Sequence, residues 1–273
     1  KPANADILVP GDVVCVIGTT SDKVPFDQCD DMRVTKEEVD LLLREGCKLV
    51  PSLADTRIIR AYAGVRPLVA SDDDPSGRNV SRGIVLLDHS KRDGIRGFIS
   101  ITGGKLTSYR LMAEMTTDLL CEKLSLEKKC ETAFTPLPGS ENHKRSTHVP
   151  ICEIAAEGRH GSQVHKMDFK GDGSELVCEC EQVSRAEINY AVKELGVKTL
   201  DDLRRRTRVG MGPCQSCYCI EKAAHILAEE IGKPEAAEDL KKEYLQKRWK
   251  GITPICWGEQ LAQAEYLRVK YGK

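Results

Sequence analysis

The pattern of apolar and polar positions predicts strands and helices in alternation over the first 130 residues. Residues 1–10 show no strand pattern of their own. Short apolar runs bounded by Gly, Pro or polar turn residues predict strands at residues 12–20, 58–61, 64–69, 83–87 and 97–101. Thr35 and Glu38 have the spacing of a helix-opening capping box, and a second helical pattern covers residues 111–120. This part of the chain is therefore expected to be mixed helix and strand.

The pattern after residue 174 is mainly helical. Ser184 and Glu187 form a second capping-box pattern, followed by apolar residues at helical spacing up to Gly196. Thr199 is the predicted start of the next helix, and residues 220–231 give a third. Two further helical patterns lie near residues 240–245 and 261–267. A small, mainly helical domain with a helical extension is predicted.

Between these parts the periodicity is weak. Pro136, Pro138 and Gly139 precede a polar run, and residues 149–173 show little regular spacing. The expected division is 1–130 for the mixed part, 131–173 for a linker, 174–234 for the small helical domain and 235–273 for the extension.

Five of the twelve cysteines gather at the two ends of residues 178–219. Cys178 and Cys180 form Cys-x-Cys, and Cys214 and Cys217 form Cys-x2-Cys after 33 intervening residues. Four soft sulfur donors suit an iron–sulfur cluster or structural zinc. The cysteines are expected in loops that face helix N-termini, whose partial positive charge favours an anionic cluster.

This arrangement resembles the [2Fe-2S] domain of bacterioferritin-associated ferredoxin and its relatives, which pair Cys-x-Cys with Cys-x2-Cys across a helical segment. The resemblance implies a [2Fe-2S] cluster held by Cys178, Cys180, Cys214 and Cys217, with Cys219 as the alternative fourth ligand. A four-cysteine zinc site remains the alternative, although its cysteine pairs usually lie roughly 15 to 20 residues apart.

Composition narrows the candidate partners. The chain has 273 residues, a formal net charge of −1 and a pI near 6.7, so no overall basic field indicates a nucleic-acid partner. The local run Arg204–Arg206 with Arg208 is either a solvated helix face or a positive patch beside the cluster. No apolar run approaches the ~18 residues of a membrane span. A soluble or peripheral protein is expected.

Nucleotide-binding signals are weak. No G-x-G-x-x-G motif follows the first strand, which indicates either a non-nucleotide protein or a sequence that lacks that part. Gly103 and Gly104 stand between a predicted strand and a predicted helix. Such a turn can bind an anion or cofactor, or it can serve packing alone.

Three stretches together resemble the anaerobic glycerol-3-phosphate dehydrogenase family, specifically its A-type chains. These are AYAGVRPL at residues 61–68, ITGGKLTSYR at residues 101–110, and the cysteine stretch. The resemblance implies an α+β fold: the later part of an FAD-dependent oxidoreductase unit followed by the small [2Fe-2S] domain. Because family members often end their site with Cys-x4-Cys-x-Cys, the choice between Cys217 and Cys219 stays open.

The same resemblance implies an activity and site residues. The family oxidises sn-glycerol 3-phosphate to dihydroxyacetone phosphate, passing a hydride to FAD and electrons through partner subunits, including a membrane-anchoring iron–sulfur subunit, to a quinone. Arg66 and Lys105 are the implied substrate-binding residues, suited to phosphate and hydroxyl oxygens. The implied flavin contacts are Gly103, Gly104, Lys105, Leu106 and Thr107. A cytoplasmic protein on the inner face of the membrane is expected, inactive as this chain alone. The alternative is a non-catalytic zinc module for partner binding.

Overall fold

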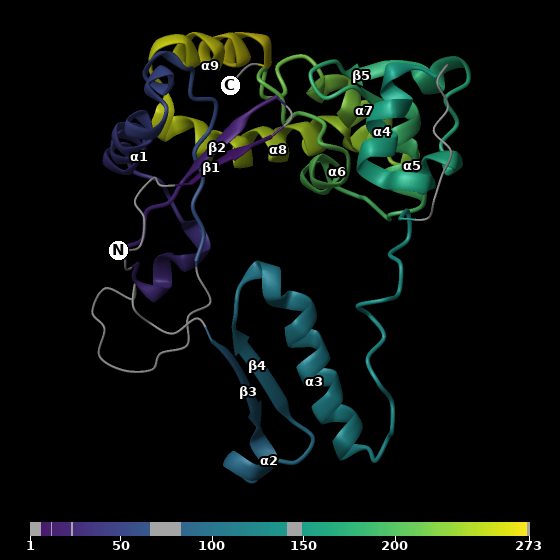
Figure 1. The fold of residues 1–273 in the computed structure, drawn as a ribbon. Helices are drawn as coiled ribbons and strands as arrows, with labels where there is room; N and C mark the ends of the chain where they lie inside the picture. Colours follow the sequence, from purple (N-terminus) through teal and green to yellow (C-terminus); the bar gives the residue numbers. More distant parts are fainter. Residues whose placement is uncertain (1–6, 12, 23, 66–82, 141–148, 272–273) are drawn as a thin grey trace.

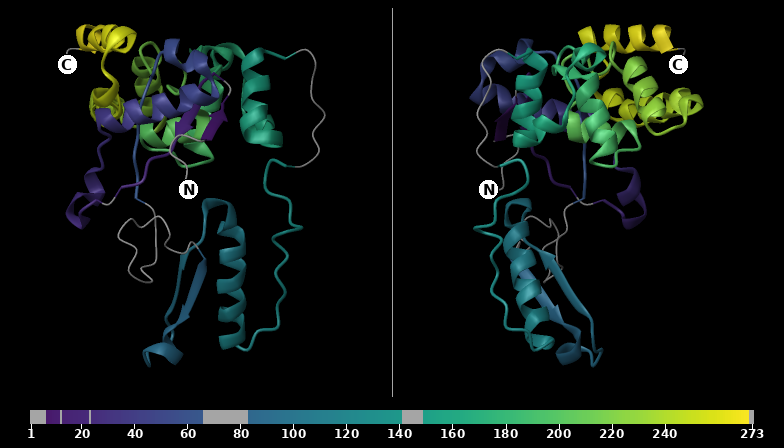
Figure 2. Two further views of the ribbon diagram at one scale, coloured as in Figure 1. Left: turned by 60° about the vertical axis from the view of Figure 1, so that its left-hand side comes forward. Right: turned by 90° about the vertical axis from the view of Figure 1, so that its right-hand side faces the viewer.

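The computed structural model describes residues 7–11, 13–22, 24–65, 83–140 and 149–271. Within these ranges the chain is an α+β protein, with helices and three two-stranded antiparallel sheets. This confirms the fold class expected from the sequence. In Figures 1 and 2, strands β3 and β4 and helix α3 form a unit that lies apart from the helical part of the chain.

The N-terminal segment contains a β-hairpin and a helix. β1 (Ile7–Pro10) pairs with β2 (Cys15–Gly18), and the turn closes through a hydrogen bond from Gly11 N to Val14 O of 2.8 Å. The expectation that residues 1–10 form no strand is therefore wrong. Pairing with β2 stabilises β1, although the local sequence shows no strand pattern. Helix α1 (Lys36–Leu49) follows η1 (Phe26–Asp31) and precedes η2 (Pro51–Asp55). The predicted capping box of Thr35 and Glu38 is present in both directions.

The segment after η2 does not form the strand predicted for residues 58–61. Instead, Ala61 N donates to Gly251 O at 2.8 Å, so this segment packs against helix α8 (Ala237–Ile252). Gly251 permits the approach, since a side chain there would meet Ala61 O at 2.6 Å. The strand predicted at residues 64–69 lies mostly outside the described residues.

The separate unit follows the predicted order of strand, turn and helix. β3 (Ile84–Asp88) pairs with β4 (Ile99–Gly103), with the short α2 (His89–Arg92) between them. The chain continues through η3 (Leu106–Ser108) into α3 (Tyr109–Lys123). Both strands lie within two residues of the predicted positions.

The small C-terminal domain begins with β5 (Leu176–Cys178) and β6 (Val183–Ser184). Helices α5 (Arg185–Lys193), α6 (Leu200–Thr207) and α7 (Ile220–Glu230) enclose its core. The fully buried side chains of that core include Ile188, Leu200, Leu203, Ile226 and Leu227. The three predicted helices are therefore confirmed, since each buries the apolar face that its spacing indicated.

Two longer helices complete the chain. η6 (Pro234–Ala236) leads into α8 (Ala237–Ile252), and η7 (Thr253–Ile255) leads into α9 (Gly258–Tyr271). Tyr244 of α8 belongs to the core of the small domain. The extension therefore packs on the domain, and Figure 1 shows α8 running from α7 towards α1 and α9.

The interval 131–173, for which the sequence predicts a linker, is helical in its second half. It contains α4 (Ile151–His160), η4 (Gly161–Lys166) and η5 (Gly171–Ser174). Its apolar residues form a second core with α5, made of Ala156, Val164, Met167, Ala186 and Tyr190. These residues are distributed over one short helix and an irregular turn, so no single period reveals them.

Candidate metal centre

The cysteines lie on two turns that meet at one place in the small domain. Cys178 ends β5 and Cys180 lies in the turn before β6, whereas Cys214 and Cys217 lie in the turns that lead into α7. Cys219 is the N-cap residue of α7. The prediction that cysteines stand at a helix N-terminus is thus confirmed for the second group, and all are free thiols.

Three of these cysteines line an open pocket of about 460 Å³. They are Cys180, Cys214 and Cys217, and the remaining wall is formed by Arg57, Pro213, Tyr218, Gln263 and Tyr266. Cys178 and Cys219 do not line the pocket and belong to the hydrophobic core of the domain. The five cysteines therefore divide into three at the pocket wall, of which Cys217 is itself buried, and two in the core of the domain.

The buried pair is electrostatically coupled. The thiol of Cys219 lowers the pKa of Cys178 to about 6, assisted by the backbone N–H groups of Gly210 and Glu181. The same interaction, together with burial, raises the pKa of Cys219. The pair thus favours a single thiolate stabilised by the neighbouring thiol, and a thiolate is the form that binds metal.

Without a metal, two of the pocket cysteines favour the thiol form over the thiolate form. Burial raises the pKa of Cys180, although the backbone of Cys214 opposes that shift. Burial also raises the pKa of Cys217, against a lowering contribution from the Gln263 side chain. A bound metal would offset this burial, because coordination deprotonates a thiol.

The cysteine sulfurs lie in pairs, which is closer to the arrangement in a two-metal cluster than to that around a single ion, and one of these pairs contains Cys219 instead of Cys217. A zinc ion with four sulfurs at about 2.3 Å brings every pair of sulfurs to within ~4 Å. Across the described ranges, which include all twelve cysteines, no three cysteine sulfurs lie within 4.8 Å of one another. Neighbouring sulfurs occur in pairs instead, Cys178 with Cys219 and Cys180 with Cys214.

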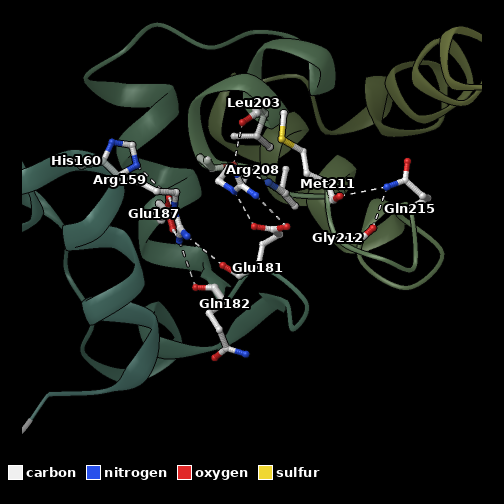
Figure 3. A network of polar contacts seen from close by, with 12 residues as sticks. Arg159, His160, Glu181, Gln182, Glu187, Leu203, Arg208, Met211, Gly212 and Gln215 are labelled. Atoms are coloured by element: carbon white, nitrogen blue, oxygen red, sulfur yellow. Dashed lines mark hydrogen bonds and ion pairs between the residues drawn. The ribbon is translucent and has the colours of Figure 1, made fainter. Parts of the chain in front are cut away.

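A glycine brings the two cysteine turns together. A side chain at Gly212 would place its Cβ closer than 3.0 Å to the Cβ of Cys180. Gly212 O also accepts a hydrogen bond of 2.9 Å from the Gln215 side chain, which donates to Met211 O at 3.1 Å as well. Figure 3 shows Gln215 directed towards these two carbonyl groups. The second turn is thus folded against the first at close distance.

The first cysteine turn is fixed by an arginine from α4. Arg159 donates to both oxygens of the buried Glu187 carboxylate at 2.7 and 2.5 Å, and to the carbonyls of Glu181 and Gln182 (Figure 3). His160 lies 3.0 Å from the same carboxylate. The capping box predicted for Ser184 and Glu187 is therefore half formed: Ser184 accepts from Glu187 N, while the Glu187 side chain binds Arg159.

A second arginine binds the same turn from the opposite side. Arg208 Nε donates to Glu181 Oε2 at 2.7 Å, and Glu181 is almost completely buried. Arg208 follows α6 with a left-handed backbone, which directs the chain back towards the cysteines. One member of the predicted arginine patch thus binds beside the cysteine site. Sequence spacing gave no signal for Arg159, which lies in the interval predicted as a linker.

The residues predicted to contact flavin lie at the end of β4. Gly103 and Gly104 have φ angles of 76° and 68°, and a side chain at Gly104 would meet Met112 Sδ at 2.5 Å. Lys105, Leu106 and Thr107 follow on the surface. The turn therefore requires glycine, whether or not it contacts a cofactor. Arg66 lies outside the described residues, so its position relative to Lys105 is not described.

A further group of potential ligands does not form a metal site. Glu221, His225 and Glu238 offer ligand atoms within 4.8 Å of one another. Lys241 Nζ lies 2.7 Å from Glu221 and 2.8 Å from Glu238, so an ammonium group already neutralises these carboxylates. We interpret the group as surface ion pairs.

Comparison with protein families defines the class. Residues 2–110 match the FAD dependent oxidoreductase family, and residues 176–229 match the BFD-like [2Fe-2S] binding domain. The chain therefore joins part of a flavin-dependent oxidoreductase domain to a [2Fe-2S]-binding domain, and both expected cofactor types are confirmed at this level.

Comparison with individual relatives identifies the enzyme family more narrowly than the domain matches do. Over 99% of its length the chain is 55% identical to the A chain of anaerobic glycerol-3-phosphate dehydrogenase from Haemophilus influenzae, and 52% identical to that of Escherichia coli K12. The A1 chain of the Haloferax volcanii enzyme is 40% identical over 95% of the chain. The chain spans about half the length of these relatives, 50%, 52% and 45% respectively. It belongs to the anaerobic glycerol-3-phosphate dehydrogenase family, so the resemblance expected from the sequence is confirmed. No solved structure matches the chain.

Proposed function

We propose that the protein containing this chain oxidises sn-glycerol 3-phosphate to dihydroxyacetone phosphate. FAD would accept the hydride, and the [2Fe-2S] domain would pass electrons to partner subunits and finally to a quinone. The observation that carries the proposal is the convergence of five thiols on one site of a matched [2Fe-2S] domain. It is supported by the relatives, which are named as a component of anaerobic glycerol-3-phosphate dehydrogenase.

The proposed cluster ligands are Cys178, Cys180, Cys214 and Cys217. Cys180, Cys214 and Cys217 share the pocket wall, which supports them as a set, and the lowered pKa of Cys178 supports it as the fourth ligand. When bound, the cluster supplies one-electron transfer. Cys219 is the substitute for Cys217, and its proximity to Cys178 supports that secondary role.

The proposed substrate residues are Arg66 and Lys105. The flavin beside them would be contacted by Gly103, Gly104, Lys105, Leu106 and Thr107. The tight turn and the surface position of Lys105 support this assignment. A guanidinium and an ammonium together would hold the phosphate and hydroxyl oxygens of the substrate.

The proposed location is the cytoplasmic face of the membrane, reached through a membrane-anchoring iron–sulfur partner subunit. None of the helices in the described ranges combines the length and apolar character that a bilayer span requires. We propose the partner subunit as the site of membrane attachment.

Anaerobic purification of the protein tests the cluster directly. We expect a brown protein that bleaches with dithionite and contains two iron and two acid-labile sulfide per chain, as a [2Fe-2S] cluster requires. A colourless protein with stoichiometric zinc would instead establish the non-catalytic zinc module.

A further inference from the structure

We propose that Gln263 of α9 is a positioning residue that raises the reduction potential of the cluster, and that Arg57 sets the orientation of its amide. The inference rests on the proposed function, in which Cys217 is a ligand of a cluster in this pocket. Both residues line the pocket but lie outside residues 176–229, the matched [2Fe-2S] domain.

The amide of Gln263 is bound to the second cysteine turn. Its Nε2 donates to Cys217 Sγ at 3.1 Å and also to the carbonyl oxygen of Cys214. An amide nitrogen carries two hydrogens, so these two bonds use its full donor capacity. One of them is aimed at a sulfur that we propose as a metal ligand.

Arg57 determines which end of the amide faces that sulfur. Its Nη1 donates to Gln263 Oε1, and its Nη2 donates to Pro213 O at 2.5 Å. Because a guanidinium group can only donate, the amide oxygen must face Arg57 and the NH2 group must face the cysteines. The orientation is therefore fixed by chemistry as well as by shape.

Two more donors hold the backbone of the same cysteine. Lys270 Nζ donates to Cys217 O at 2.8 Å, and Tyr271 Oη donates to that oxygen at 2.9 Å. The α9 helix thus supplies three side chains to one cysteine, and two cationic groups, Lys270 and Arg57, act electrostatically on its sulfur.

This arrangement favours the reduced cluster. Reduction adds one electron, and part of the added charge resides on the cysteine sulfurs. A hydrogen bond to sulfur is therefore stronger in the reduced state, which raises the reduction potential. Arg57 belongs to residues 2–110, the part matched by the oxidoreductase family, which we call the oxidoreductase half. The reduction potential of the cluster therefore depends on contact between this half and the cysteine-containing half of the chain.

The test is a redox titration of the cluster in the anaerobically purified protein containing this chain, followed by visible absorption and electron paramagnetic resonance. Gln263→Met keeps the length of the side chain but removes its donors. We expect about a tenfold loss in the equilibrium constant for reduction, which corresponds to a fall in midpoint potential of about 59 mV. Gln263→Glu, which replaces the donor by a carboxylate, should lower the potential at least as far.

Gln260 provides a matched control on the same helix. It is 2% exposed, and among the described atoms its side-chain nitrogen and oxygen have no hydrogen-bond partner. Gln260→Met should leave the potential unchanged, with iron and sulfide content equal to that of the unchanged protein.

The possible outcomes are distinct. An unchanged potential in both Gln263 variants, with the cluster intact, overturns the inference and leaves the proposed function standing. Loss of the cluster from both variants assigns Gln263 a structural role, which also overturns it. Absence of iron from the unchanged protein would instead reject the proposed function itself.

Discussion

At the scale of single residues, the geometry of the cysteine site depends on close contacts that a single side chain would prevent. Gly212 has no conformational signal in the sequence, yet its missing side chain allows the Cys180 turn to approach. By contrast, the glycines at 103 and 104 are recognisable as a turn from their place between strand and helix. The cysteines were identifiable by spacing, but their division into a pocket group and a buried pair was not.

Substitution of Gly212 should therefore damage cluster assembly. Gly212→Ala introduces a methyl group against Cys180, and we expect iron content to fall by more than half, measured by metal analysis after anaerobic purification. Gly158→Ala is the control: it lies inside α4 with no atom within 4 Å of the new methyl group. It should keep its iron and gain up to about 1 kcal/mol of stability.

The cysteines should differ in their tolerance of serine. The sequence around Cys178, Cys180 and Cys214 offers no cysteine beyond the proposed ligands themselves, so serine at any of the three should abolish the cluster absorption. Cys217→Ser should retain part of it, because Cys219 lies two residues away beside Cys178. Equal and complete loss in Cys217→Ser and Cys219→Ser would contradict this account. Cys256→Ser, a cysteine outside the pocket wall, serves as control.

At the scale of elements, helix caps and apolar spacing predicted most helices. The structure of the other segments depends on contacts with residues far along the chain. α5, α6 and α7 follow their apolar spacing and caps. The residues 58–61 have the composition of a strand but bind α8 instead, because no strand in the described part of the chain pairs with them. α4 is held by a buried ion pair that no periodicity indicates.

Removal of Arg159 should strongly destabilise the small domain. Arg159→Met leaves the fully buried Glu187 without its guanidinium partner, which costs about 3–5 kcal/mol for a buried pair. Urea unfolding followed by circular dichroism measures the change. Glu187→Gln added to that variant should recover part of the loss, because it removes a buried carboxylate charge that only His160 then contacts.

The exposed pair of Arg268 and Glu265 provides the comparison on α9. Arg268→Met should change the stability by less than about 1 kcal/mol, as is usual for surface ion pairs. A similar loss in both arginine variants would show that burial is not the cause.

At the scale of the whole molecule, the two halves serve different steps of one proposed reaction. Arg66 and Lys105 belong to the oxidoreductase half, and the cysteines belong to the small domain. The hydrogen bond from Arg57 Nη2 to Pro213 O is a direct polar link between the two regions.

Substitutions in the two halves should therefore separate flavin reduction from onward electron transfer in the whole enzyme. Arg66→Ala removes a charged hydrogen bond of about 1.5–3 kcal/mol, roughly 10- to 150-fold in kcat/KM, and should leave the cluster intact. Cys178→Ser should keep single-turnover flavin reduction and lose quinone reduction. Stopped-flow absorbance measures both steps. A wild-type rate of flavin reduction in Arg66→Ala at subsaturating substrate would reject the substrate assignment.

The sequence by itself determined most helices of the small domain and the presence of a cysteine-rich metal site. Cysteine spacing, helix caps and the Gly103–Gly104 turn act over a few residues, so they are recognisable without the fold. Only the tertiary structure decided which side chains surround the cysteines: Arg57, Arg159, Arg208 and Gln263 come from four separate segments. Their hydrogen bonds join residues between 22 and 206 positions apart, and no local pattern encodes contacts at such separations.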